Sequence, residues 1–126
     1  MELEEALFFG RRTMLLEPYA RLRQAIVSRW PDTRVRVQKT QIDFVSERPF
    51  CWVSRPTAGG RRKDRPPAYF IVTFGWREQI GHPRILEAVE PWPGRWTHHV
   101  LVSGPEEVDG TLMDWIAQSR LWRDSV

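Results

Sequence analysis

Apolar residues between positions 15 and 30 recur at intervals of three or four. They are Leu15, Tyr19, Leu22, Ile26 and Trp30. This spacing places them on one face of a helix. Pro18 fits such a helix only near its start, and Pro31 ends it. The pattern predicts an amphipathic helix over residues 16–30. The preceding segment, residues 1–14, is expected either to form a short helix that docks through its leucines and Phe8, or to fray.

Four segments have the composition and alternation of β strands. They cover residues 34–45, 50–55, 68–75 and 95–102. The link SERP suits a tight hairpin between the first two segments, and TAGGRRKDRPP suits a long exposed loop before the third. The third segment is apolar at most positions, which predicts a central strand that is covered on both faces.

The segment VRVQKTQIDF, residues 35–44, changes its alternation in the middle. Val35 and Val37 put the apolar face at odd positions, whereas Ile42 and Phe44 put it at even positions. One regular strand cannot keep a single apolar face through such a change. We therefore expect a bulge, bend or turn at the centre of this segment, where a bulge would redirect the polar side chains toward a cleft.

Helical patterns return after the third strand. Residues 83–89 predict one helical turn with apolar residues at Ile85, Leu86 and Val89, and prolines follow it. Ser103 then begins a capping-box pattern with the glutamate three residues later. An apolar helix face follows the box: Val108, Leu112, Trp115, Ser119 and Trp122. The pattern predicts a second amphipathic helix at the end of the chain.

The order of these elements predicts a fold class. Helix, strands and helix within 126 residues fit one α+β domain over residues 1–126. In this fold an antiparallel sheet of about four strands packs against two long amphipathic helices. The chain is long enough to bury a core without metal or disulfide support.

Composition places the chain among soluble globular proteins. Hydrophobic residues make up 41% and charged residues 28%, and no apolar run approaches the roughly 20 residues of a transmembrane helix. We therefore expect no membrane association. Cys51 is the single cysteine, so no internal disulfide can form, and a reducing cytoplasm is the expected location. A buried thiol is the simplest interpretation of Cys51.

Positive charge is concentrated in one part of the chain. Residues 34–65 hold nine basic and three acidic residues, although the net charge of the whole chain is only +3. Such a patch can bind nucleic acid, and it can equally be a solvated face. The alternative function is therefore a nucleic-acid-binding module that uses the basic loop, with the residues Arg55, Arg61, Arg62, Lys63 and Arg65.

Polar residues near strand ends suggest a binding site. Lys39 is one of only two lysines among 19 basic residues, and its compact ammonium differs from a guanidinium in geometry and hydration. We hypothesise that Lys39 and Gln41 turn toward Arg95 and His98. Cations and an imidazole in one cleft favour an anion. Arginine beside loop tryptophans also suits an anion or a planar ligand, which adds two residues to the candidate site: Arg84 and Trp92.

No catalytic or metal-binding motif is present. His98 and His99 are adjacent in a predicted strand and therefore point to opposite faces, and no His or Cys spacing matches a zinc site. Nucleophile-elbow, phosphate-loop and dinucleotide-binding motifs are absent, and no cofactor is expected. An enzyme that uses His98 is the third functional hypothesis. The first is a binding domain for a small anionic ligand or a partner protein.

Several short segments carry a family resemblance. They are KTQIDF, PFCWV, IVTFG, HPRI, VEPWPGRWTHHV and SGPEEVD. Over about residues 19–122 they resemble a small bacterial family, domain-of-unknown-function family 5655. The resemblance implies a single compact domain, which occurs alone or beside other small domains. It implies no particular activity.

Overall fold

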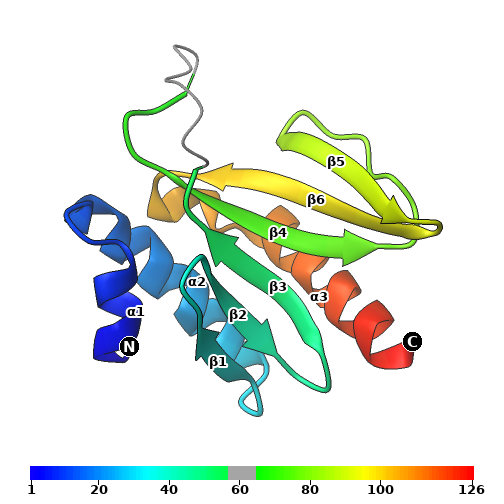
Figure 1. The fold of residues 1–126 in the computed structure, drawn as a ribbon, viewed down its shortest axis with the longest axis horizontal. Helices are drawn as coiled ribbons and strands as arrows, with labels where there is room; N and C mark the ends of the chain where they lie inside the picture. Colours follow the sequence, from blue (N-terminus) through cyan, green and yellow to red (C-terminus); the bar gives the residue numbers. More distant parts are fainter. Residues whose placement is uncertain (57–64) are drawn as a thin grey trace.

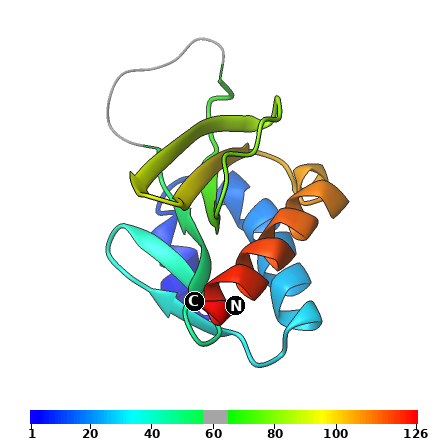
Figure 2. The same cartoon turned by 90° about the vertical axis from the view of Figure 1, so that its right-hand side faces the viewer.

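The computed structural model describes residues 1–56 and 65–126 and shows one antiparallel sheet with its main helices on one side (Figures 1 and 2). The strands are β1 (Arg34–Val37), β2 (Gln41–Val45), β3 (Pro49–Ser54), β4 (Phe70–Trp76), β5 (Ile85–Trp92) and β6 (Arg95–Val102). The helices are α1 (Leu3–Phe8), α2 (Leu16–Arg29) and α3 (Gly110–Ser125), with short 3-10 helices η1 (Thr13–Leu15) and η2 (Pro105–Glu107).

The strands lie in the order β1-β2-β3-β4-β6-β5, and every neighbouring pair is antiparallel. The predicted α+β class with an antiparallel sheet is confirmed. The predicted detail of four strands and two long helices is wrong. The described part of the chain has six strands, one long internal helix, α2, and the C-terminal helix α3.

The change of alternation in residues 35–44 is a hairpin turn. Val37 pairs with Ile42, and the amide of Gln38 donates to the carbonyl of Gln41 at 2.8 Å. The chain thus reverses direction between β1 and β2. Because paired residues in a ladder point to the same face, the odd valines and the even Ile42 and Phe44 all face the helices.

The helical turn predicted for residues 83–89 is wrong, because this segment forms β5. Ile85 pairs with Val100 and Ala88 with His98, with register shifts on either side. The apolar residues that suggested a helix therefore belong to a bulged strand, which lacks simple alternation. Gly94, with φ 74°, closes the β5–β6 hairpin in the left-handed conformation that glycine adopts easily.

Helix α3 begins later than the capping pattern predicted. The N-cap is Asp109, whose Oδ1 accepts from the amide of Leu112 at 3.0 Å. The amide and hydroxyl of Ser103 instead donate to Oε1 of Glu107, at 2.8 and 2.9 Å. Ser103 therefore stabilises the turn around η2, and the helix start depends on a carboxylate six residues farther on.

The core lies between the helices and one face of the sheet. Fully buried residues include Tyr19, Leu22, Ile26, Phe44, Phe70, Phe74, Val100, Leu112 and Ile116. Cys51 is fully buried among them, and burial raises the pKa of its thiol well above the ordinary value. Across residues 1–56 and 65–126, no helix combines the length and apolar composition that a membrane crossing requires.

The N-terminal segment docks through a carboxylate. Leu3 and Leu7 are exposed, whereas Glu5 and Phe8 are buried. Glu5 accepts hydrogen bonds from the Tyr19 hydroxyl, from Arg23 Nε at 2.7 Å and from the amide of Glu2 at 2.7 Å. Docking through Phe8, which belongs to the core, is therefore confirmed. Docking through the leucines is wrong, because α1 contacts α2 through a partly buried ion pair.

Burial raises the pKa of the Glu5 carboxyl, but the hydrogen bonds from Tyr19, from the Glu2 amide and from Arg23 outweigh burial and leave the pKa below its ordinary value. Glu5 therefore stabilises the fold fully above the pKa it has in the unfolded chain, and this stabilisation is lost as pH falls through the folded-state pKa.

We expect Glu5→Gln to lower the free energy of unfolding by about 2 kcal/mol at pH 7, because a neutral amide replaces a charged acceptor of three hydrogen bonds. The difference from the wild type should shrink in acid, where Glu5 itself becomes protonated. Urea unfolding at several pH values measures both effects. Glu4→Gln, at an exposed neighbour, is the control and should change stability by less than about 0.5 kcal/mol. A constant difference at every pH would contradict the assigned role.

Candidate functional site

A serine hydroxyl separates two central strands at one end of the sheet. The ladder between β3 and β4 ends at the pair Cys51 and Phe74. At the next position, the Ser119 hydroxyl of α3 donates to the carbonyl of Phe50 at 2.7 Å and accepts from the amide of Gly75 at 2.9 Å. Beyond this point β3 and β4 diverge (Figure 1). Ser119 therefore satisfies the two backbone groups that the divergence would otherwise leave unpaired.

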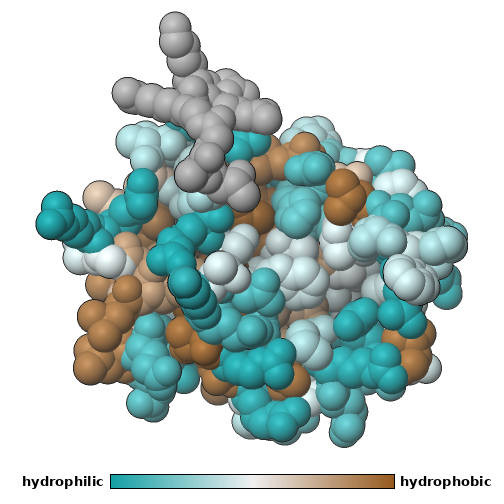
Figure 3. All heavy atoms as spheres, viewed as in Figure 1, coloured by the Kyte–Doolittle hydropathy of each residue, from teal (hydrophilic) through white to brown (hydrophobic). Residues whose placement is uncertain are grey.

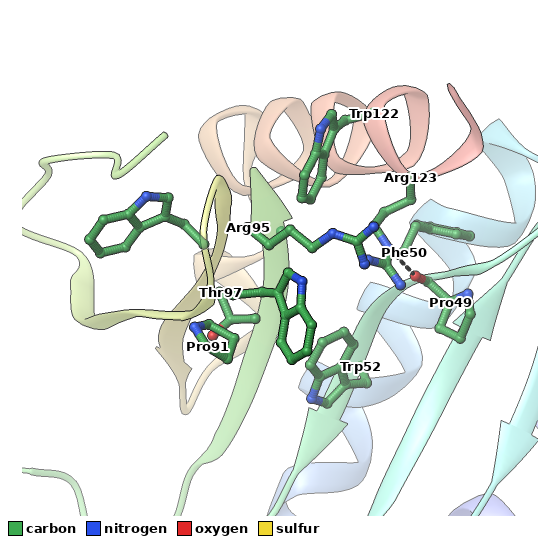
Figure 4. Close-up of a pocket in the computed structure, with 11 residues that line it drawn as sticks. Pro49, Phe50, Trp52, Pro91, Arg95, Thr97, Trp122 and Arg123 are labelled. Atoms are coloured by element: carbon green, nitrogen blue, oxygen red, sulfur yellow. Dashed lines mark hydrogen bonds between the residues drawn. The ribbon is translucent and has the colours of Figure 1, made fainter. Parts of the chain in front are cut away.

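A pocket of about 240 Å³ occupies the space beside the diverging strands. The start of β3, the end of β4, the β5–β6 hairpin and the last turns of α3 all contribute to it (Figure 4). Its lining residues are Pro49, Phe50, Trp52, Gly75, Pro91, Trp92, Arg95, Trp96, Thr97, Trp122 and Arg123. Four of the seven tryptophans of the chain are among them, so indole rings form a large part of the walls.

The position of Trp122 depends on the absence of a side chain at Gly75. A Cβ atom at residue 75 would lie 2.8 Å from Cζ3 of Trp122, which is closer than carbon atoms approach. Trp122 also contacts Trp76 edge to face, with ring centroids 6.3 Å apart. The indole therefore packs directly on the backbone of β4 and forms one wall of the pocket.

Two arginines make the pocket positive. Arg123 donates from Nε to the carbonyl of Pro49 at 3.2 Å, and Figure 4 shows its side chain close to that of Arg95. Burial lowers the pKa of the Arg123 guanidinium, and the positive charges of Arg95 and Arg48 lower it further. Within residues 1–56 and 65–126, neither Arg95 nor Arg123 forms an ion pair, and no carboxylate lines the pocket.

Two residues of the predicted site, Trp92 and Arg95, line this pocket. Lys39 and Gln41 lie elsewhere. Lys39 is exposed in the β1–β2 turn at the far edge of the sheet, and Gln41 donates to Oδ1 of the buried Asp43. The turn that we expected to direct Lys39 into a cleft directs it into solvent instead.

His98 and Arg84 have structural contacts. His98 is fully buried on the helix-facing side of β6, its ring stacks on Phe74 at 5.3 Å, and its Nε2 accepts from the amide of Ile80 at 3.0 Å. Arg84 donates to both carboxylate oxygens of Asp109, at 2.8 and 2.9 Å. A single pocket that joins Lys39, Gln41, Arg95 and His98 is therefore wrong, because the sheet and the core separate these side chains.

The basic loop is described only at its ends. Arg61, Arg62 and Lys63 lie outside the described residues. Arg55 donates to the carbonyls of Phe8 and Lys39, and Arg65 donates to the Tyr69 hydroxyl at 3.1 Å. These two arginines thus have partners within the domain. Among residues 1–56 and 65–126, no three His, Cys, Asp or Glu side chains are grouped as a metal site requires.

We expect Ser119→Ala to lower the free energy of unfolding by about 2 kcal/mol, because it leaves a buried amide and a buried carbonyl without partners. Ser125→Ala is the matched control, since this exposed hydroxyl only donates to the Trp122 carbonyl near the end of the chain. The control should change stability by less than about 0.5 kcal/mol. Equal stability of the two variants in urea unfolding would show that Ser119 does not support the separated strands.

Comparison with known proteins places the chain in a family. A family model described as "Domain of unknown function (DUF5655)" matches residues 4–119. No curated protein and no solved structure matches the chain. The family match includes the N-terminal helix, which the sequence resemblance omitted, and it extends over nearly the whole described fold. The chain therefore belongs to the DUF5655 family.

Proposed function

We propose that this domain binds a small planar organic anion, an aromatic carboxylate, in the pocket between β3, β4 and α3. The observation that carries the proposal is the combination of indole walls with two arginines that have no acidic partner among the described residues. Aromatic rings pack well against tryptophan, and a guanidinium binds a carboxylate through charge-assisted hydrogen bonds.

The size of the pocket favours a ligand of about one ring. A cavity of about 150 Å³ is sufficient for benzene, and the pocket here measures about 240 Å³. The additional volume suits one charged substituent. Larger planar ligands could contact the rim through Trp92, which is 67% exposed.

The arginines are arranged to attract a negative charge. Arg123 is already partly desolvated and is held by the Pro49 carbonyl, so less conformational entropy is lost when it binds. The Arg95 side chain is exposed, and its guanidinium forms no ion pair within residues 1–56 and 65–126, which leaves it free for a ligand. An anion between the two would also relieve the repulsion of two like charges.

The other hypotheses have less support. Catalysis through His98 would require a buried imidazole to reach a substrate through the core. Nucleic-acid binding through the basic loop stays a prediction, since the two described arginines of that set are bonded within the domain. Recognition of a partner protein also stays a prediction.

We expect Arg95→Gln to weaken benzoate binding about tenfold, because a charge-assisted hydrogen bond contributes roughly 1.5–3 kcal/mol. Stability should be unchanged, since the Arg95 side chain is exposed. Lys39→Gln removes the same charge at the exposed β1–β2 turn, so it is the matched control and should bind benzoate as the wild type does. Calorimetric titration measures all three proteins. Equal weakening by both substitutions would indicate a nonspecific charge effect.

A ligand series tests the two halves of the pocket separately. We expect benzoate to bind at least about tenfold more tightly than benzamide, which has the same ring but no charge. Acetate, which has the charge but no ring, should also bind more weakly than benzoate because it cannot pack on the indoles. Quenching of the tryptophan fluorescence provides the measurement. Equal affinity for benzoate and acetate would contradict an aromatic pocket.

A further inference from the structure

A row of polar side chains crosses the face of the sheet opposite the helices. Residues in register across the strands are Arg36, Asp43, Trp52, Thr73, His99 and Glu87. Over this face the surface is mostly hydrophilic or neutral, with the largest hydrophobic group at the lower left, around α1, and smaller hydrophobic groups elsewhere (Figure 3). The row therefore belongs to the sheet face away from the helices, where Asp43 and Thr73 are each only 1% exposed, and one of its members, Trp52, also lines the pocket.

His99 lies next to the pocket on this face. It follows Thr97, a lining residue, by two positions in β6, and residues two apart in a strand point to the same face about 7 Å from each other. Thr73, its partner in β4, is itself paired with Trp52 in β3. His99 is thus adjacent to two pocket walls, whereas its neighbour His98 points into the core.

The His99 imidazole is held in place by Thr73. The Thr73 hydroxyl and His99 Nδ1 are 2.8 Å apart, and Thr73 is only 1% exposed, so it acts as a positioning residue. Burial lowers the pKa of His99 and the Glu87 carboxylate partly opposes this, which leaves the ring neutral at pH 7. His99 is only half-buried, and its Nε2 has no hydrogen-bond partner within residues 1–56 and 65–126.

We propose that His99, which lies just beyond the lining residues Trp52 and Thr97, binds a hydroxyl group on a ligand that extends out of the pocket, so that the preferred ligand is an aromatic acid with a hydroxyl opposite its carboxylate. This inference rests on the proposed function. The carboxylate lies at Arg95 and Arg123, at the start of β6 and the end of α3. The ring lies beside Trp52 and Thr97, and its opposite end points along β6 toward His99.

The chemistry of the neutral imidazole favours a hydroxyl over other groups. If Nδ1 carries the proton and donates to Thr73, Nε2 accepts; in the other tautomer Nε2 donates. A hydroxyl satisfies both cases because it is both a donor and an acceptor. A second carboxylate would satisfy only one tautomer and would also approach Glu87, which is paired with His99 in register.

The test compares 4-hydroxybenzoate with benzoate in the wild type and in two variants at residue 99. Asparagine can keep a polar atom near the Nδ1 position but does not reach as far as Nε2, whereas glutamine reaches approximately as far as Nε2. We expect the wild type to bind 4-hydroxybenzoate about fivefold more tightly than benzoate, as one net hydrogen bond implies. His99→Asn should abolish this preference, and His99→Gln should retain part of it. Calorimetric titration gives each ratio.

The readout is the ratio of the two affinities within each protein, so a change of the pocket that weakens both acids alike cancels. Equal affinity of the wild type for the two acids would overturn the role of His99 and leave the pocket proposal standing. A preference that survives in His99→Asn would also overturn it. If neither acid binds the wild type, the proposed function fails together with this inference.

Discussion

The separation of β3 and β4 at Ser119 is the constraint on which the site depends. Two neighbouring strands normally continue to pair until one of them ends, because unpaired backbone groups are costly when buried. Here a side chain from α3 supplies both missing hydrogen bonds, to Phe50 and from Gly75. The last turns of α3 can then place Trp122 and Arg123 beside the strands. If the Ser119 hydroxyl did not bond to these two backbone groups, β3 and β4 would continue to pair and would close the space that the ligand is proposed to fill.

The fold could be predicted from sequence where each element has one clear period. Helix α2 and the strands that alternate regularly were recognised in this way. The prediction failed where one stretch of sequence fits two different patterns of apolar spacing. Residues 34–45 contain two strands and a turn with no glycine or proline to separate them, and only the shift of the apolar positions indicated a break. In residues 85–92, register shifts disturb the alternation of a strand, so its apolar residues have a helix-like spacing.

The site was harder to predict, because its walls come from elements far apart in the chain. Trp92 could be identified as a tryptophan outside the apolar patterns, although it ends β5 and does not lie in the predicted loop, and Arg95 as a cation at the start of a predicted strand. Ser119 and Trp122 lie on the apolar face of a helix. That position is as typical of a core residue as of a residue that lines a site. Gly75 gave no signal, since a glycine at a strand end usually marks a turn. Ser119, Trp122 and Gly75 become site residues only through contacts between α3 and β4, and the periodicity of either element alone does not encode these contacts.

The single cysteine of the chain lies close to the point where β3 and β4 separate. Cys51 belongs to the last paired position of the β3–β4 ladder, directly beside the Ser119 contact. Its thiol is fully buried, so a thiol reagent can reach it only when this part of the domain opens. The chain therefore contains a natural reporter of local opening. At a reagent concentration high enough for modification to outpace reclosing, the rate at which Cys51 becomes modified gives the lifetime of the closed state around this residue.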